Sequence, residues 1–181
     1  MRIITGSLKG RRLRLPASFP ARPTTDFART GLFNVLSNLM DFEGARLLNL
    51  YSGSGIIAFE FISRGGKIAM CVDLNPLTTR FIQSECDRLR VYHKIYPLCR
   101  PVPVYLKQAT QEFDLIFADP PFNEANYPQL LKEIFSSDAV GPHTLVVLEH
   151  PGEDFTAHPA HFDSRRYGRV HFSFFKKPVK N

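Results

Sequence analysis

The sequence predicts an α/β fold in which a mostly parallel sheet carries helices on both of its faces. Short apolar runs of strand length alternate with segments of helical periodicity along most of the chain. Near-continuous apolar strands are typical of parallel sheets that helices cover on both sides. One main domain is expected, because 181 residues, 44% of them hydrophobic, suffice for one well-buried core.

The expected elements follow one another in order. Residues 1–15 indicate two short strands around Gly6 to Gly10. Thr24 or Thr25 then caps a helix that runs to about Met40. The remaining pattern predicts strands over 46–51, 67–73, 94–98, 113–118 and 145–149, helices over 56–64, 75–89 and 127–135, and a final strand within 165–177.

The positive charge is concentrated at the start of the chain. Residues 1–29 hold seven basic side chains against Asp26, so this segment carries the whole net charge of +6 and residues 30–181 sum to zero. The cluster is either a solvated surface or a face that binds a polyanion, and the asymmetry favours the second. The basic residues are Arg2, Lys9, Arg11, Arg12, Arg14, Arg22 and Arg29.

Composition argues against several classes of protein. No stretch approaches the roughly 20 apolar residues that cross a bilayer, and the first residues lack the apolar core of a signal peptide. The three cysteines have no CxxC spacing, and the six histidines are scattered without ligand spacing. We therefore expect a cytoplasmic protein with reduced thiols, no metal and no membrane contact.

A glycine loop lies between an expected strand and an expected helix. Ligands of open α/β sheets bind at such loops, and Gly53 and Gly55 allow the backbone to approach a ligand closely. Asp73 ends the next strand, where its carboxylate can accept hydrogen bonds from a ribose diol. Together with Ala58, these residues also fit the dinucleotide fingerprint. The loop by itself leaves a nicotinamide enzyme, a methyltransferase and a structural turn open.

The segment from Asp119 to Phe122 distinguishes between these possibilities. The lone pair of an exocyclic base amine is delocalised into the ring, so the amine attacks a methyl sulfonium only when acceptors bind its N–H protons. The Asp119 carboxylate and the Pro120 carbonyl oxygen can both accept, and the two prolines stiffen the turn. Phe122 offers a face on which the base can stack. This pattern favours a base-amine methyltransferase.

Motifs along nearly the whole chain resemble the RsmD family, bacterial methyltransferases that modify guanine N2 in 16S ribosomal RNA. The opening segment, the cofactor loop and the Asp-Pro-Pro-Phe segment occur together and in the family's order. The motifs are Arg2-Ile3-Ile4-Thr5-Gly6 with Lys9-Gly10-Arg11, Arg22-Pro23-Thr24-Thr25-Asp26, Leu32-Phe33-Asn34-Val35-Leu36, Leu50 to Gly55 with Glu60, Ser63-Arg64-Gly65, Asp119-Pro120-Pro121-Phe122, Glu149-His150 and Tyr167-Gly168.

The resemblance implies a Rossmann-like class I fold that depends on S-adenosylmethionine, with a seven-stranded sheet and an N-terminal hairpin and helix. It divides the chain into an RNA-contacting extension, 1–43, and a methyltransferase domain, 44–181. It implies 16S ribosomal RNA or the small ribosomal subunit as partner, and we expect a monomer. The implied site residues are Asp119, Pro120, Pro121 and Phe122 for catalysis; Asn49, Tyr51, Ser52, Gly53, Ser54, Gly55, Asp73 and Leu74 for the cofactor; and Lys9, Arg11, Arg12, Arg14, Arg22, Thr25 and Arg29 for RNA.

Two departures from the family pattern keep alternatives open. Asn49 stands where members usually carry Asp, and no acidic residue occurs between Asp87 and Glu112, where members have a Gly-Asp pair. A non-catalytic RNA-binding relative with a weakened cofactor site is therefore one alternative. A DNA base-amine methyltransferase is another, although no segment suggests a DNA target-recognition domain. A nicotinamide oxidoreductase would need a substrate domain, for which too few residues follow Phe122.

Overall fold

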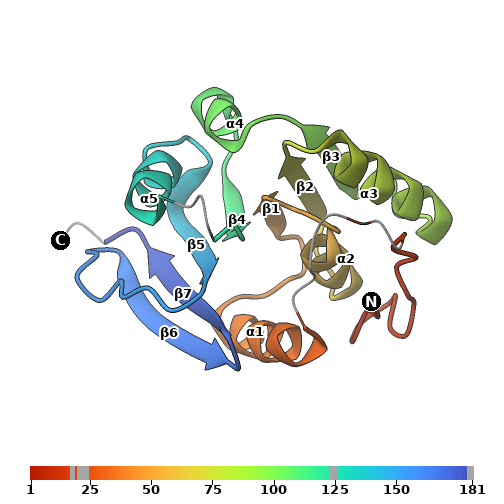
Figure 1. Ribbon diagram of the computed structural model, residues 1–181, viewed down its shortest axis with the longest axis horizontal. Helices are drawn as coiled ribbons and strands as arrows, with labels where there is room; N and C mark the ends of the chain where they lie inside the picture. Colours follow the sequence, from red (N-terminus) through yellow and green to blue (C-terminus); the bar gives the residue numbers. More distant parts are fainter. Residues whose placement is uncertain (17–18, 20–24, 123–125, 179–181) are drawn as a thin grey trace.

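A seven-stranded mixed sheet forms the centre of the protein (Figure 1). The computed structural model describes residues 1–16, 19, 25–122 and 126–178. The strand order is β3-β2-β1-β4-β5-β7-β6, which confirms the predicted Rossmann-like α/β class. The strands are β1 (Arg46–Leu50), β2 (Ile68–Asp73), β3 (Ile95–Cys99), β4 (Phe113–Ala118), β5 (Val140–His150), β6 (His161–Tyr167) and β7 (Val170–Lys176).

Strands β1 to β5 run parallel, and β7 and β6 follow as an antiparallel hairpin. β1 pairs with β2 on one side and with β4 on the other, so the order of the strands reverses between β1 and β4. Such a reversal leaves a crevice outside the carboxyl ends of the two strands, where open α/β sheets bind ligands. The topology therefore places the candidate site at the ends of β1 and β4.

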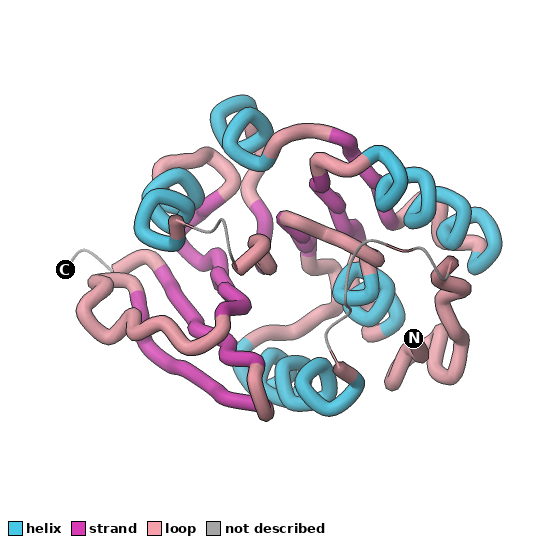
Figure 2. The backbone as a smooth tube through the Cα atoms, viewed as in Figure 1, coloured by secondary structure: helices cyan, strands magenta, loops and turns pink. Residues whose placement is uncertain are grey.

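Helices cover both faces of the sheet (Figure 2). The neighbouring residues Leu47 and Leu48 of β1 are both fully buried, and they belong to two separate hydrophobic clusters. Successive side chains of a strand point to opposite faces, so each cluster is the core of one face. α1 (Asp26–Leu39), α2 (Ile56–Ser63) and α3 (Pro76–Leu89) cover the first, while α4 (Val102–Gln108) and α5 (Tyr127–Phe135) cover the second.

Two elements were not expected from the sequence. α4 contains Pro103 and is preceded by Pro101, but proline is tolerated in the first turn of a helix because its missing N–H has no partner there. β6 is the edge strand, and much of it is exposed, so it lacks the apolar run of a buried strand. β5 also begins earlier than expected, at Val140, with an irregular register beside β4.

The N-terminal residues form a hairpin with one bridge pair, Arg2 and Arg12, in place of the two short strands that were expected. The Ile3 amide donates to the Arg11 carbonyl at 2.9 Å. At the tip, Gly6 has a φ of +87°, and a Cβ there would lie 1.7 Å from the carbonyl oxygen of Ser63. Only glycine allows the tip to lie this close to the end of α2.

The hairpin and α1 share the core of the first face. Ile3, Leu13 and Phe33 are buried in the same hydrophobic cluster as Leu47 of the sheet. Residues 1–43 therefore pack as part of the domain core, and their separate role as an RNA-contacting extension stays a prediction.

One buried carboxylate, that of Glu60 on α2, fastens this N-terminal layer to the domain. Its two oxygens accept from the amides of Ile4 and Thr5 at 2.9 and 3.1 Å. Arg64 lies 3.1 Å from the same carboxylate, and the buried guanidinium of Arg29 lies 3.8 Å from it. A buried charge is tolerated only when it is paired and hydrogen-bonded, so this set of contacts accounts for a fully buried Glu60.

We predict that Glu60→Ala lowers the free energy of unfolding by about 3–5 kcal/mol, because it removes one of the two carboxylates paired with the buried Arg29 and leaves two hairpin amides without their acceptor. Urea denaturation measures the change. Glu43→Ala is the matched control, since Glu43 is exposed, and this variant should stay within about 0.5 kcal/mol of the parent. Equal effects of the two substitutions would contradict the structural role of Glu60.

Candidate active site

The carboxyl ends of β1, β2 and β4 bring the candidate residues to one edge of the sheet (Figure 1). The Ser52 amide donates to the Val72 carbonyl at 3.1 Å, which joins the loop after β1 to β2. The Asp119 amide approaches the Leu50 carbonyl at 3.4 Å, which joins the loop after β4 to β1. The glycine loop, Asp73 and Asp119, separated in the sequence, therefore share one site.

Positive φ angles shape the loop after β1. Tyr51, Gly53 and Gly55 have φ values of 55°, 49° and 72°. The Gly55 amide donates to the Ser52 carbonyl at 2.8 Å, and Gly55 gives α2 no side-chain cap. The first amides of a helix lack partners within the helix, so this end of α2 offers N–H donors to a ligand.

Asp73 is held in place by the glycine loop itself. One carboxylate oxygen accepts from the Gly53 amide at 2.8 Å, and the other accepts from the Asn75 amide at 2.8 Å. A carboxylate has about four acceptor sites, so two remain for a ligand. Leu74, the next residue, is 67% exposed beside it. The arrangement can present an oriented acceptor pair and an adjacent apolar surface to a nucleoside.

The remaining predicted cofactor residues lie around the loop. Asn49 is buried on the first face, beside Cys71 of β2, to which it is paired in register. The Ser52 hydroxyl is buried and has no hydrogen-bond partner within the described chain. Ser54 lies 3.8 Å from the Met1 sulfur, and the half-buried Tyr51 packs against the core of the second face. The structure thus gathers all eight predicted residues around one loop.

The loop after β4 presents a carboxyl group with an altered acidity. Burial raises the pKa of Asp119 from 3.8 to about 7. Pro120 is buried and Pro121 is exposed, while the Phe122 ring is 44% exposed at the surface. The site therefore combines a carboxyl group that titrates near neutral pH with an accessible aromatic face.

Tyr127 is a site residue that the sequence did not indicate. It begins α5, and its hydroxyl is buried without a partner in the described chain. Burial, followed by the charges of Glu153, Asp119 and Glu149, raises its pKa to about 12, so the hydroxyl keeps its proton. Its only sequence signal was its position at the start of the helix that follows Phe122.

His150, at the end of β5, is held by hydrogen bonds on both ring nitrogens. Nδ1 accepts from the Glu153 amide at 2.9 Å, so Nε2 donates to the Ser173 hydroxyl at 2.9 Å. Burial first, and then the neighbouring His171, lowers its pKa to about 4. A neutral imidazole with a hydrogen bond on each nitrogen holds the end of β5 in place beside Tyr127.

The predicted RNA-binding residues separate into three groups. Lys9, Arg11, Arg12 and Arg14 are exposed. Arg29 is fully buried and donates to the Arg2 carbonyl at 2.6 Å. It therefore stabilises the fold and is not exposed to RNA, contrary to the prediction.

Thr25 also has a structural role, because its hydroxyl caps α1 by accepting from the Ala28 amide at 3.2 Å. Arg22 lies outside the described residues. Within the described part of the chain, no helix is long and apolar enough to cross a membrane. The same residues contain no group of three or more potential metal ligands.

The sheet order, the glycine loop after β1 and the Asp-Pro-Pro-Phe turn after β4 define a Rossmann-like methyltransferase class. A hypothetical protein of Thermus thermophilus has a similar structure, with a TM-score of 0.83 and 28% identity over 97% of this chain and 99% of that chain. A SAM-dependent methyltransferase from Thiobacillus denitrificans, solved with S-adenosyl-L-homocysteine, shares the fold at a TM-score of 0.60 and 18% identity, over 74% of this chain and 51% of that one.

Sequence comparison identifies the family. A family model described as conserved hypothetical protein 95 matches residues 1–176. YlbH of Bacillus subtilis, provisionally named an rRNA methyltransferase, is 32% identical over 84% of each chain. Ribosomal RNA small subunit methyltransferase D of Escherichia coli is 25% identical over 85% of this chain and 76% of its own length. The chain belongs to this RsmD-type family, which confirms the resemblance found in its motifs.

The acidity of Asp119 predicts a pH-dependent stability. Because its folded pKa of about 7 exceeds the ordinary 3.8, ionisation opposes folding, and this effect is complete only above pH 7. Asp119→Asn should therefore raise the melting temperature, and more so at pH 8 than at pH 5. A pH-independent effect of Asp119→Asn would contradict the raised pKa.

Proposed function

We propose that the protein transfers a methyl group from S-adenosylmethionine to the exocyclic N2 amine of a guanine in 16S ribosomal RNA. The observation that carries the proposal is the Asp119 carboxyl, whose pKa is raised to about 7 by desolvation, in the same turn as the exposed ring of Phe122 and at the strand ends that also hold the glycine loop. Membership of the RsmD-type family supports the reaction, and the name of the E. coli relative supports the ribosomal substrate.

The residues at the glycine loop fit S-adenosylmethionine. The uncapped start of α2 and the buried Ser52 hydroxyl, which has no partner in the described chain, offer polar groups for an amino acid moiety. The oriented Asp73 carboxylate suits the ribose diol, and the exposed Leu74 suits the face of an adenine. At the end of β3, Cys99 and Arg100 occupy the place of the family's acidic residue, so this chain relies on Asp73 and the loop for polar contacts with the nucleoside.

The chain's residues supply the acceptors that activate the amine. S-adenosylmethionine, when bound, supplies an electrophilic methyl group on sulfur. The Asp119 carboxylate accepts a hydrogen bond from the target N–H and orients the nitrogen lone pair, and the Pro120 carbonyl accepts from the second N–H. The exposed Phe122 ring stacks on the base. A carboxylate with a pKa of about 7 is also basic enough to take the proton that the amine loses after transfer.

An RNA substrate also suggests which residues contact RNA and where in the cell the enzyme acts. The exposed Lys9, Arg11, Arg12 and Arg14 would contact phosphates, whose neutralisation releases counterions. We propose a monomer as the active form. With ribosomal RNA as its substrate, the enzyme acts in the cytoplasm.

Cofactor affinity tests the glycine-loop assignment. Asp73→Ala should weaken binding of S-adenosyl-L-homocysteine by about 1.5–3 kcal/mol, the range for hydrogen bonds to a charged group. Isothermal titration calorimetry measures the loss, and a thermal melt checks the fold. Asp87→Ala, on the exposed side of α3, is the control and should bind normally. A folded Asp73→Ala protein with the parent's affinity would place the cofactor elsewhere.

Methyl transfer tests the chemistry. Asp119→Asn should lower the single-turnover rate on a 16S ribosomal RNA transcript by about 10²–10³-fold, by analogy with the loss of one preorganised polar group. Cofactor affinity should remain unchanged. The parent rate should rise with pH to a plateau above about 7, because only the carboxylate accepts from the amine.

Controls in the same assay separate the remaining possibilities. Phe122→Tyr should keep the activity that Phe122→Ala loses, since a tyrosine ring also stacks. A DNA duplex of the same sequence serves as the competing substrate. Near-parent turnover of Asp119→Asn would refute amine activation by this residue, and faster transfer to the DNA would refute the RNA assignment.

A further inference from the structure

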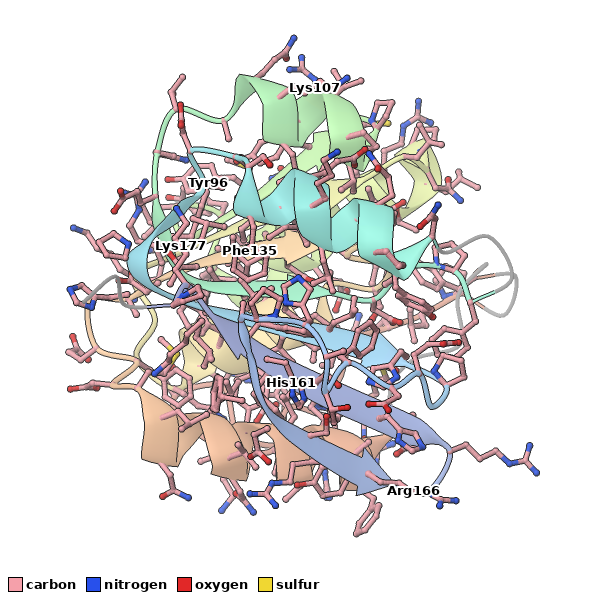
Figure 3. All side chains as sticks on the ribbon, turned by 90° about the vertical axis from the view of Figure 1, so that its left-hand side faces the viewer. Tyr96, Lys107, Phe135, His161, Arg166 and Lys177 are labelled. Carbon is pink, nitrogen blue, oxygen red and sulfur yellow. The ribbon has the colours of Figure 1, made fainter. Side chains whose placement is uncertain are left out.

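A second group of basic side chains lies far from the first in sequence, at the turn between β6 and β7. Arg165, Arg166 and Arg169 are all exposed there. Arg165 is paired with Asp163 at 3.0 Å, and the Arg166 Nε donates to the Gly168 carbonyl at 3.0 Å. Figure 3 shows Arg166 at the outer end of this hairpin. From residue 155 onward the sequence holds six basic residues against Asp163 alone, so the chain's C-terminal part is also basic.

The turn is anchored to the start of α1 by aromatic contacts. The half-buried Tyr167 ring meets Phe27 edge-on, with the ring centroids 5.7 Å apart, and also contacts Phe172. A Cβ on Gly31 would lie 2.1 Å from the Tyr167 ring, so the glycine lets this ring pack onto α1. The arginines therefore project from a fixed turn.

Phe27 adds an aromatic face to this surface. Its side chain is 69% exposed, although it contacts Tyr167. The neighbouring Asp26 carboxylate forms an ion pair with Arg29 at 2.9 Å, which offsets its negative charge. An exposed ring among arginines matches the platforms on which proteins stack unpaired bases while cations contact the backbone. We call Phe27, Arg165, Arg166, Tyr167 and Arg169 the hairpin patch.

The hairpin patch and the candidate active site lie at the same end of the sheet, where the parallel strands have their carboxyl ends. β7 runs antiparallel to β5, and His171 pairs with His150 at the carboxyl end of β5. The turn before β7 therefore lies at the end of the sheet to which Asp119 belongs, since β4 and β5 are parallel. A nucleic acid with a base at Asp119 and a segment bound at the patch would therefore lie along one end of the sheet.

We propose that the hairpin patch is an RNA-docking surface, in which Arg166 and Arg169 contact phosphates that flank the target nucleotide and Phe27 stacks on a neighbouring unpaired base. This inference rests on the proposed function, because the RNA is the substrate of the same site. The patch is separate from the basic N-terminal hairpin, which packs on α2 and α3 at the other side of α1.

Charge removal at two matched places tests the docking surface. Arg166→Gln/Arg169→Gln removes two charges from the patch, and Lys67→Gln/Lys107→Gln removes two exposed charges elsewhere, from the residue before β2 and from the last turn of α4. Binding of a 16S ribosomal RNA transcript is measured over a range of salt. The arginine variant should raise the dissociation constant and lower the log–log salt slope by roughly 0.7–0.9 for each phosphate that is no longer neutralised, and the lysine variant should change neither.

Phe27 supplies an independent measurement. Phe27→Ala should weaken RNA binding by about 5- to 150-fold because the base no longer stacks on a ring, and Phe27→Tyr should restore it. Binding of S-adenosyl-L-homocysteine should match the parent in both variants, and Phe27→Tyr, which keeps a ring against Tyr167, should also keep the parent's melting temperature.

The outcomes separate this inference from the proposed function. A parent protein that neither binds nor methylates the transcript would overturn both. A parent that methylates it, with an arginine variant of unchanged salt slope and a Phe27→Ala variant of unchanged affinity, would overturn the docking surface alone. Weaker binding of the variants to assembled small subunits, with unchanged affinity for the transcript, would assign the patch to a ribosomal protein and would also overturn the inference.

Discussion

The buried carboxylate of Glu60 determines how the first third of the chain is arranged. A charge at this depth is stable only among donors, and the donors come from three different segments: the hairpin amides, Arg29 of α1 and Arg64 at the end of α2. Any one of these segments could shift only by leaving part of the carboxylate unsatisfied. The hairpin, α1 and α2 are therefore fixed to one another before apolar packing is considered.

This constraint fixes both basic surfaces relative to the site. The hairpin that carries Arg11 and Arg12 rests on α2, whose other end begins at the glycine loop. α1 is held through Arg29, and its first turn in turn contacts Tyr167 of the β6–β7 hairpin. The Glu60 cluster thus links the N-terminal hairpin to α1, and α1 contacts the β6–β7 hairpin, so helices and a packed hairpin connect the two basic surfaces.

Asp119 shows a conflict between stability and chemistry. Burial raises its pKa to about 7, which means that the ionised form destabilises the fold at the pH at which it would act. The nearby Tyr127 hydroxyl is protonated and has no hydrogen-bond partner in the described chain. Like Asp119, it is a desolvated polar group that a ligand could stabilise.

The sequence predicted most of the parallel sheet because its strands are apolar runs that end at recognisable loops. It missed α4, where prolines at the first turn conceal a helix, and β6, where an exposed edge strand needs no apolar run. Motifs predicted the site residues around Gly53 and Asp119, which the structure places at neighbouring strand ends, yet the sequence could not separate exposed arginines from the buried Arg29. Burial of that side chain depends on Glu60 and the Arg2 carbonyl as well as on the nearby Asp26, and the contacts with distant residues leave no local pattern. Tyr127 was missed for the same reason.

The Glu60 and Ser63 contacts also impose an order on folding. They join residues that are 55 to 58 positions apart, and Arg88 of α3 holds the Arg12 carbonyl across 76 positions. At about 5–20 residues per second, the ribosome makes the partners of the hairpin roughly 3–15 s after the hairpin itself. During that interval the most basic segment of the nascent chain cannot pack against its partners. It emerges beside the ribosome, which is itself made largely of RNA, a polyanion.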